Sequence, residues 1–251
     1  MIGIFDSGVG GLSVFREIRK LLPEERYIYY SDNAHCPYGE KTREYIIDRA
    51  RAITEFLLSN GADIIVVACN TATAAAISTL REEYPVQFIG MEPAVKPAAA
   101  KTRSGVVGVL ATAGTLKAEK YLTTRGKYAD EVRFVEHVGE GFVELVERGA
   151  LKGEEAEAIV RRSLLPLLEA GADTIVLGCT HYPFLAETIA KVASEFCPER
   201  EISIIDPAPA VAKHLMEIME EHRLIRNDGF SVELNSSGNE DNLTRLYESL
   251  V

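Results

Sequence analysis

The sequence predicts an α/β protein built from two similar parallel-sheet domains that arose by internal duplication. Three observations indicate this class. Short apolar runs alternate with amphipathic stretches along all 251 residues, which is typical of strands joined by helical crossovers. The runs are apolar on both faces, as in parallel strands that are buried under helices. Finally, several stretches recur in the same order about 110 residues apart.

The expected elements follow this alternation from the first residues onward. Apolar runs predict strands at Ile2–Phe5, Tyr27–Ser31, Ile64–Ala68, Gln87–Gly90, Gly105–Leu110, Val132–Glu136, Thr174–Gly178, Ile202–Ile205 and Ser231–Leu234. Amphipathic periodicity predicts helices that include Thr42–Leu58, Ala72–Tyr84, Glu154–Glu169, Pro183–Phe196 and Pro209–His222. Because helical patterns separate the apolar runs, consecutive strands should be parallel.

The duplication is visible in three pairs of segments. GADIIVVACNT (61–71) matches GADTIVLGCTH (171–181), and each has a cysteine eight positions after its first glycine. FIGMEPAV (88–95) matches IIDPAPAV (204–211), and IGIFDSG (2–8) matches VGVLATAG (107–114) more loosely. Chance likeness between buried strands is the alternative, but three matches in the same order favour duplication. The second copy should begin near Gly105, with a tail after about residue 222.

Composition and charge exclude several classes of function. The 27 basic and 38 acidic residues give a net charge of −11, which argues against nucleic acid as a partner. No apolar run is long enough to cross a membrane, and the N-terminus lacks the basic region of a signal peptide. Four cysteines without a regular spacing fit reduced thiols better than disulfides. We therefore expect a cytoplasmic protein that acts on a small molecule and has no nucleic-acid or membrane partner.

Polar and reactive residues collect where the predicted strands end, which is where open parallel sheets bind ligands. Asp6 and Ser7 follow the first strand, and the segment SDNAHCPYG (31–39) follows the second. The two duplicated strands end in Cys69-Asn70-Thr71 and in Cys179-Thr180-His181. The sequence therefore predicts a site made from these strand ends.

Each duplicated cysteine also stands directly before a predicted helix. Asn70 or Thr71 could cap the first of these helices, and Thr180 the second. The N–H groups and positive dipole end of a helix stabilise a thiolate, and an unperturbed thiol titrates near ~8.5. A lone cysteine is more often a small buried apolar residue, but two at matched strand ends favour a chemical role for Cys69 and Cys179.

Two thiols, one on each wall of a cleft between the domains, could carry out racemisation. One thiolate would remove a proton from a carbon while the opposite thiol donates one, with no metal or cofactor. Asp6, at the end of the first strand, and His181, two residues beyond Cys179, are available to assist. A zinc site is disfavoured because CxxC pairs are missing. Cys36 and Cys197 have no duplicated counterpart and are interpreted as structural or incidental thiols.

Four motifs carry a resemblance to a known family: IGIFDSGVGG (2–11), PYG (37–39), VVACNTA (66–72) and GCTHYP (178–183). Through them the whole chain resembles the glutamate racemase family of the aspartate/glutamate racemase superfamily. The resemblance implies interconversion of L- and D-glutamate without a cofactor, supply of D-glutamate for peptidoglycan, and a homodimer. It also implies that the C-terminal segment returns to the first domain, so that residues 1–94 with 209–251 face residues 95–208 across a cleft.

The resemblance further implies roles for individual residues. Cys69 would handle the proton of the D-isomer with help from Asp6, and Cys179 that of the L-isomer with help from His181. Glu147, in FVELVERG, matches a further acidic residue near the site. Substrate contacts would fall on Asp6, Ser7, Tyr38, Gly39, Asn70, Thr71, Thr115, Thr180 and His181. The chain departs from the family at Gly139-Glu140, where Cys-Pro is usual, and at His35, where arginine is frequent.

Other functions stay open on this sequence. The chain could be a racemase for aspartate or another amino acid, or a related decarboxylase or isomerase, although decarboxylases of this kind need one thiol. It could also be a catalytically inactive regulatory binding protein with the same fold. A thiol–disulfide oxidoreductase is disfavoured, because its cysteines would be close in sequence and these are 110 positions apart.

Overall fold

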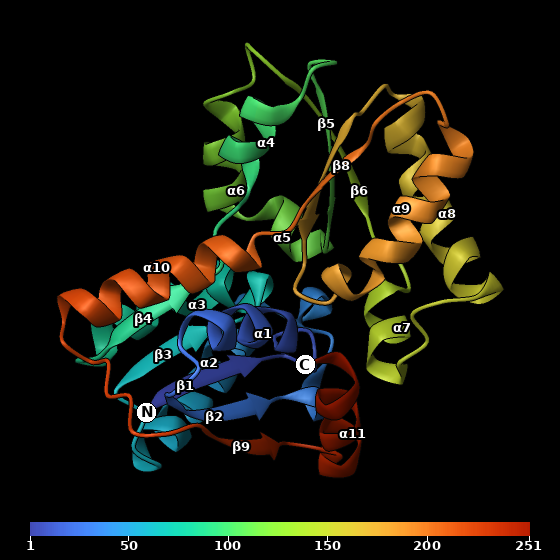
Figure 1. The fold of residues 1–251 in the computed structure, drawn as a ribbon. Coiled ribbons are helices and arrows are strands. Elements are labelled where there is room, and N and C mark those ends of the chain that lie inside the picture. Colours follow the sequence, from blue (N-terminus) through green and yellow to red (C-terminus); the bar gives the residue numbers. More distant parts are fainter. The chain divides into compact units, whose positions relative to one another are not determined.

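The computed structural model describes residues 1–251 and divides into two compact units. Unit 1 contains Met1–Glu92 and Ala208–Val251, and unit 2 contains Pro93–Pro207. Each unit holds one parallel sheet covered by helices, so the predicted α/β class with two parallel sheets is confirmed (Figure 1). No helix in the structure is both long and apolar enough to cross a membrane.

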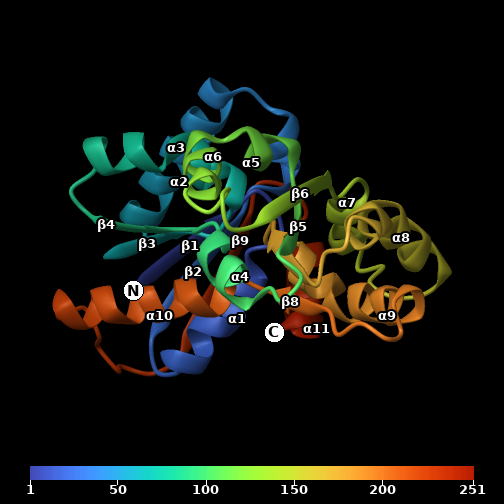
Figure 2. The same cartoon turned by 90° about the horizontal axis from the view of Figure 1, so that it is seen from above.

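The sheet of unit 1 has five parallel strands in the order β4-β3-β1-β2-β9. These strands are β1 (Ile2–Asp6), β2 (Arg26–Ser31), β3 (Ile64–Val67), β4 (Gln87–Gly90) and β9 (Ser231–Ser236). The helices of the unit are α1 (Leu12–Leu21), α2 (Arg43–Ser59), α3 (Asn70–Glu83), α10 (Ala208–Glu221) and α11 (Glu240–Leu250), with short 3-10 helices η1 (Asn33–His35) and η2 (Tyr38–Glu40). Helices α2 and α3 lie on one side of the sheet, and α1 and α10 on the other (Figure 2).

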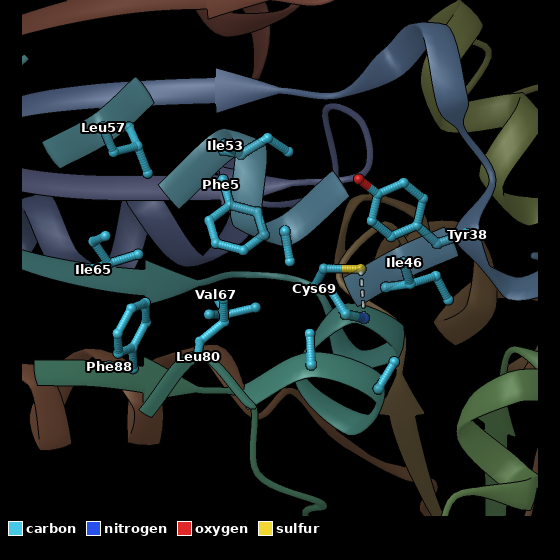
Figure 3. Packing of buried hydrophobic residues seen from close by; sticks show 14 of the residues in the cluster. Phe5, Tyr38, Ile46, Ile53, Leu57, Ile65, Val67, Cys69, Leu80 and Phe88 are labelled. Carbon is cyan, nitrogen blue, oxygen red and sulfur yellow. Dashed lines mark hydrogen bonds between the residues drawn. The ribbon is translucent and has the colours of Figure 1, made fainter. Parts of the chain in front are cut away.

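The main core of unit 1 lies between the sheet and helices α2 and α3. Phe5 and Val67, which are partners in the register of β1 and β3, pack there with Ile53 and Leu57 of α2 and Leu80 of α3 (Figure 3). Burial of such side chains contributes about 1.5–3 kcal/mol each. This packing holds the carboxyl ends of β1 and β3 side by side.

The sheet of unit 2 has four parallel strands in the order β6-β5-β7-β8. These strands are β5 (Val106–Ala111), β6 (Arg133–Val138), β7 (Thr174–Gly178) and β8 (Ser203–Ile205). The helices are α4 (Val95–Lys101), α5 (Ala113–Lys117), α6 (Glu119–Gly126), α7 (Phe142–Arg148), α8 (Glu154–Glu169), the 3-10 helix η3 (Tyr182–Leu185) and α9 (Ala186–Phe196). Helices α4 and α6 pack against one face of the sheet, where Val107, Val109 and Val176 are buried.

Both units use the same order of strands. Read from the opposite edge, β8-β7-β5-β6 corresponds to β4-β3-β1-β2, as a duplication requires. The repeated cysteine segments end on the equivalent strands β3 and β7. The second repeat begins within β4 and β8 and continues to where the chain passes between the units, at Glu92–Pro93 and again at Pro207–Ala208.

Some helices lie outside those predicted, and one predicted helix begins differently. Helix α1 is amphipathic and buries Leu12, Val14, Phe15 and Ile18, and α11 follows β9. The helix expected at Pro183–Phe196 begins as the 3-10 helix η3 and becomes α-helical only from Ala186. Strand β9 pairs with β2 in parallel and becomes the edge of the first sheet.

Candidate functional site

Cys69 lies at the junction of β3 and α3 in unit 1. Its backbone is extended (φ −140°, ψ 122°), and its sulfur accepts a hydrogen bond of 3.4 Å from the backbone N–H of Ala72 (Figure 3). The expectation that Asn70 or Thr71 caps this helix is therefore wrong, since they are its first two residues and Cys69 itself is the N-cap. The sulfur takes the place of the usual side-chain oxygen. A thiolate here receives an N–H group and the positive end of the helix dipole.

Ser7 connects this thiol to the end of β1. The Cys69 thiol lies 3.7 Å from the Ser7 hydroxyl oxygen, to which it donates, and the Ser7 oxygen lies 3.5 Å from Oδ1 of Asp6. Both distances exceed those of strong hydrogen bonds, and contacts of this kind tighten when a substrate binds. The other oxygen of Asp6 accepts a 2.7 Å bond from the N–H of Gly11. Asp6 thus holds the loop before α1, and Ser7 is its link to the thiol.

Gly11 is required by this arrangement. A Cβ atom on Gly11 would stand 2.8 Å from the Cβ of Asp6 and 2.8 Å from the hydroxyl of Tyr29. That hydroxyl donates a 3.0 Å bond to the carbonyl of Gly8. The glycine-rich loop therefore lets the backbone approach the Asp6 carboxylate closely.

Asn70 has an unsatisfied polar atom. Its Oδ1 is buried and has no hydrogen-bond partner within the protein. Buried polar atoms are nearly always paired, and an exception calls for an explanation. A donor group of a ligand next to Cys69 would supply the missing partner.

Tyr38 and Gly39 lie on η2, in the segment that follows β2. The side chain of Tyr38 is buried in the same cluster as Cys69 (Figure 3). Its hydroxyl donates to Oδ2 of Asp32. Burial, and then the neighbouring Asp32 carboxylate, raise the pKa of Tyr38 well above its ordinary value. Asp32 was not among the residues predicted from sequence, although it stands in the polar segment after the second strand.

In unit 2, Cys179 lies beyond β7 in a row of three functional groups. The sulfur is 3.8 Å from Nδ1 of His181, and Nε2 of His181 is 2.7 Å from Oε1 of Glu147. The relative exposures of Cys179 and His181 are 7% and 2%, so water reaches neither freely. Glu147 belongs to α7, whose flanking residues Gly141 (φ +81°) and Gly149 (φ +74°) have the left-handed backbone that favours glycine. The structure thus brings Glu147 to Cys179 and His181, which follow it in sequence by more than thirty positions.

The geometry of this row determines the state of the imidazole. A carboxylate only accepts hydrogen bonds, so Nε2 of His181 must carry the proton that Glu147 receives. A neutral His181 then presents a lone pair on Nδ1 to the Cys179 thiol. When it takes up a proton there, the adjacent carboxylate stabilises the resulting imidazolium. The sequence expectation that Thr180 caps the next helix is wrong, because His181 occupies the N-cap of η3.

Tyr182 follows Cys179 in the chain, and Thr115 lies beyond β5, the strand that pairs with β7. The hydroxyl of Tyr182 donates a 3.3 Å bond to the carbonyl of Gly139, and its ring packs edge-on against Phe142 at 4.9 Å. Burial, and then the charge of Cys179, raise the pKa of Tyr182 well above its ordinary value. Thr115 lies within α5, which follows β5, the neighbour of β7, and its hydroxyl lies 2.9 Å from that of Thr112, the N-cap of this helix.

The predicted site residues thus form two groups, one in each unit. Unit 1 gathers Asp6, Ser7, Tyr38, Gly39, Cys69, Asn70 and Thr71 at the carboxyl ends of β1, β2 and β3. Unit 2 gathers Glu147, Cys179, Thr180 and His181 beyond β7 and on α7, with Thr115 at the end of the neighbouring strand. Each group contains one thiol and at least one polar side chain in contact with it.

Comparison with known proteins identifies a family that the sequence of this chain matches. The family model for Asp/Glu/Hydantoin racemases matches residues 2–215. The chain is 51% identical over 225 residues to the glutamate racemase of Ectopseudomonas mendocina, covering 89% of this chain and 84% of that protein.

Solved structures agree with the sequence comparison. Glutamate racemase isoform RacE1 from Bacillus anthracis superposes with a TM-score of 0.87 at 31% identity, covering 99% of this chain and 92% of that one. The Escherichia coli glutamate racemase, solved with L-glutamate, has a TM-score of 0.81 at 34% identity, with coverage of 94% and 97%.

Proposed function

Because the chain belongs to the Asp/Glu/Hydantoin racemase family and is an amino-acid racemase, we propose that it interconverts L- and D-glutamate by proton transfer between two cysteines. The substrate is supported by its glutamate racemase relatives, one of which was solved with L-glutamate. The single observation that carries the mechanism is that each duplicated cysteine contacts its own polar partner. Cys69 contacts Ser7 and a helix N–H, and Cys179 contacts His181.

In the direction from L- to D-glutamate, Cys179 acts as the base. His181 accepts the thiol proton on Nδ1, and the resulting thiolate removes the proton from Cα. The electron pair of the broken C–H bond stays on Cα and is delocalised into the substrate carboxylate. The Cys69 thiol then donates its proton to the opposite face of Cα, so the stereocentre inverts and the charge moves from one sulfur to the other.

In the reverse direction, Cys69 is the base. Its thiolate is stabilised at the start of α3, where the Ala72 N–H bonds to the sulfur. Ser7 and Asp6 support this side and exchange the proton of the thiol with the surroundings. The buried Oδ1 of Asn70 accepts a hydrogen bond from the substrate ammonium, which supplies the partner that the protein lacks there.

The mechanism is tested by replacing each thiol and measuring both racemisation and solvent-deuterium incorporation at Cα. Purified Cys69→Ala and Cys179→Ala variants are assayed with L- and D-glutamate in D₂O, without added pyridoxal phosphate. Both should lose racemisation. Cys197→Ala, which removes a buried thiol at the end of α9, is the matched control and should keep the wild-type rate. Full racemisation by either site variant contradicts the proposal.

The biological part of the proposal rests on the family resemblance alone. We infer that the enzyme works in the cytoplasm as a homodimer and supplies D-glutamate for peptidoglycan. Rescue of a bacterial strain that requires D-glutamate would support this role, and rescue should fail with the Cys69→Ala variant. Comparing L-glutamate with L-aspartate in the same exchange assay decides the preferred substrate.

A further inference from the structure

We propose that Asp32 is a positioning residue for substrate binding, which holds the hydroxyl of Tyr38 and thereby the turn Tyr38–Glu40 beside Cys69. The inference rests on the proposed function, because Tyr38 and Gly39 are its expected substrate contacts. It adds to that function a buried carboxylate that touches neither thiol and acts through Tyr38.

Asp32 is fully buried and receives bonds from several segments of unit 1. Arg49 of α2 donates two in a fork, from Nε to Oδ2 at 2.9 Å and from Nη2 to Oδ1 at 2.7 Å. Nδ1 of His35 is 2.9 Å from Oδ1, and the Ser237 side chain also bonds to the carboxylate. The Asp32 N–H donates a 2.9 Å bond to the carbonyl of Asp6. Asp32 therefore joins β1, α2 and the segment after β9 at one point.

The charge of Asp32 is maintained by these donors. Burial by itself raises the pKa of a carboxyl, but the bonds from Arg49, Tyr38, Ser237 and His35 outweigh it and lower the pKa of Asp32 below its ordinary value. The pKa of Arg49 is raised in turn, chiefly by its bond to Asp32. The carboxylate is thus a permanent acceptor for the Tyr38 hydroxyl.

Tyr38 transmits this constraint toward Cys69. Its ring packs in the cluster that contains Cys69 and Ile46 (Figure 3). Its hydroxyl proton is committed to Asp32, so the phenol cannot rotate freely or act as an acid. The hydroxyl therefore fixes where η2 begins and, with it, the backbone of the turn Tyr38–Glu40.

The rival interpretation is that Asp32 and Arg49 form an ion pair that only ties α2 to the sheet. Loss of such a pair would lower stability without changing the affinity for glutamate. A positioning role instead predicts a rise in KM that depends on the Tyr38 hydroxyl. The two interpretations therefore differ in a double-mutant cycle.

The experiment measures KM, kcat and the midpoint of thermal unfolding for Asp32→Asn, Tyr38→Phe and the double variant. Each single variant should raise the KM for both glutamate enantiomers about tenfold, the usual effect of losing one good hydrogen bond, with kcat changed less than about threefold. The double variant should be no worse than the more impaired single variant, because both changes remove one interaction.

Glu83→Gln is the matched control. It breaks another forked bond to an arginine of α2, in which Arg51 donates to Glu83 at 2.8 and 2.6 Å, outside this cluster. Its KM should be that of the wild type. Ser237→Ala, which removes one donor to Asp32, covers the case in which Asp32→Asn does not fold, and it should raise KM about two- to threefold.

Three results would overturn the proposal: a lowered unfolding midpoint with wild-type KM in Asp32→Asn, a wild-type KM in Tyr38→Phe, or additive effects in the double variant. If Asp32→Asn does not fold, wild-type KM in Ser237→Ala would overturn it as well. Failure of the proposed function is recognised separately, because Cys69→Ala or Cys179→Ala would then racemise glutamate normally.

Discussion

Replacing Glu147 by glutamine should slow the proton transfer at Cys179. The substitution keeps the shape of the side chain but removes the negative charge 2.7 Å from Nε2 of His181. A hydrogen bond between charged groups contributes about 1.5–3 kcal/mol, and each 1.4 kcal/mol is a factor of ten. The Glu147 side chain is 18% exposed and therefore partly screened by water, so we expect the lower part of this range, about a 10- to 30-fold loss in kcat.

The assay separates the two proton transfers by isotope effects. Enantiomers have equal free energies, so kcat/KM must fall equally in both directions whichever thiol is impaired. With L-glutamate deuterated at Cα, the isotope effect on kcat/KM should rise, because Cys179 removes the deuteron in the slowed step. With D-glutamate deuterated at Cα it should fall, because Cys69 removes the deuteron before the slow step.

The control for this prediction is Glu144→Gln. Glu144 is an exposed acid on the same helix α7, and its loss should leave both isotope effects unchanged. A Glu147→Gln variant with less than a threefold loss in kcat would refute the reasoning. So would isotope effects that change alike for both enantiomers.

Other predictions concern stability. Asp32 and Asp173 have lowered pKa values, because the hydrogen bonds to their carboxylates outweigh their burial. Both carboxylates therefore stabilise the fold at a pH above the pKa they have in the unfolded chain. This stabilisation disappears as the pH falls through the pKa they have in the folded protein. The stability deficit of Asp32→Asn in urea should thus shrink at acid pH, and a constant deficit would contradict this. Gly139→Ala would place a Cβ 2.5 Å from the Tyr182 hydroxyl and should cost about 1–3 kcal/mol; an unchanged unfolding midpoint would show that the ring moves aside freely. Thr73→Val removes two hydrogen bonds of 3.0 Å. The Thr73 hydroxyl donates one to the carbonyl of Val67 at the end of β3 and accepts the other from the N–H of Met91 after β4. The substitution should cost about 1–3 kcal/mol, whereas wild-type urea unfolding would exclude an important role for these bonds.

The positions of the two cysteines could be predicted from sequence because the signal is local. An apolar run, a polar break and a helical pattern follow one another within twenty residues, and the pattern occurs twice. The identity of the cap could not be predicted, because Asn70 and Thr71 have better capping side chains than Cys69. The helix begins one residue earlier than those propensities suggest, since the backbone of Cys69 is still extended as it leaves β3.

Asp32 could not be assigned because, although His35 and Tyr38 are near it in sequence, its other two side-chain partners are distant in the chain. Arg49 follows it by 17 positions and comes from a helix, while Ser237 comes from the segment after β9. The parallel pairing of β9 with β2 has no local sign either, since an edge strand is chosen by tertiary packing. The resemblance indicated Glu147, but its bond to His181 depends on where α7 lies in unit 2.

The two thiols occupy equivalent strand ends, yet their surroundings differ. Cys69 depends on a helix N–H and on Ser7 from the neighbouring strand. Cys179 depends on His181 from its own loop and on Glu147 from α7. The two units therefore share the position of the sulfur and not the groups that surround it. In the proposed racemisation kcat/KM must be equal for the two enantiomers, so this difference would appear in kcat and KM separately and in the isotope effects, with compensating changes in kcat and KM. Two different sets of partners around the thiols are thus compatible with the symmetric reaction that we propose.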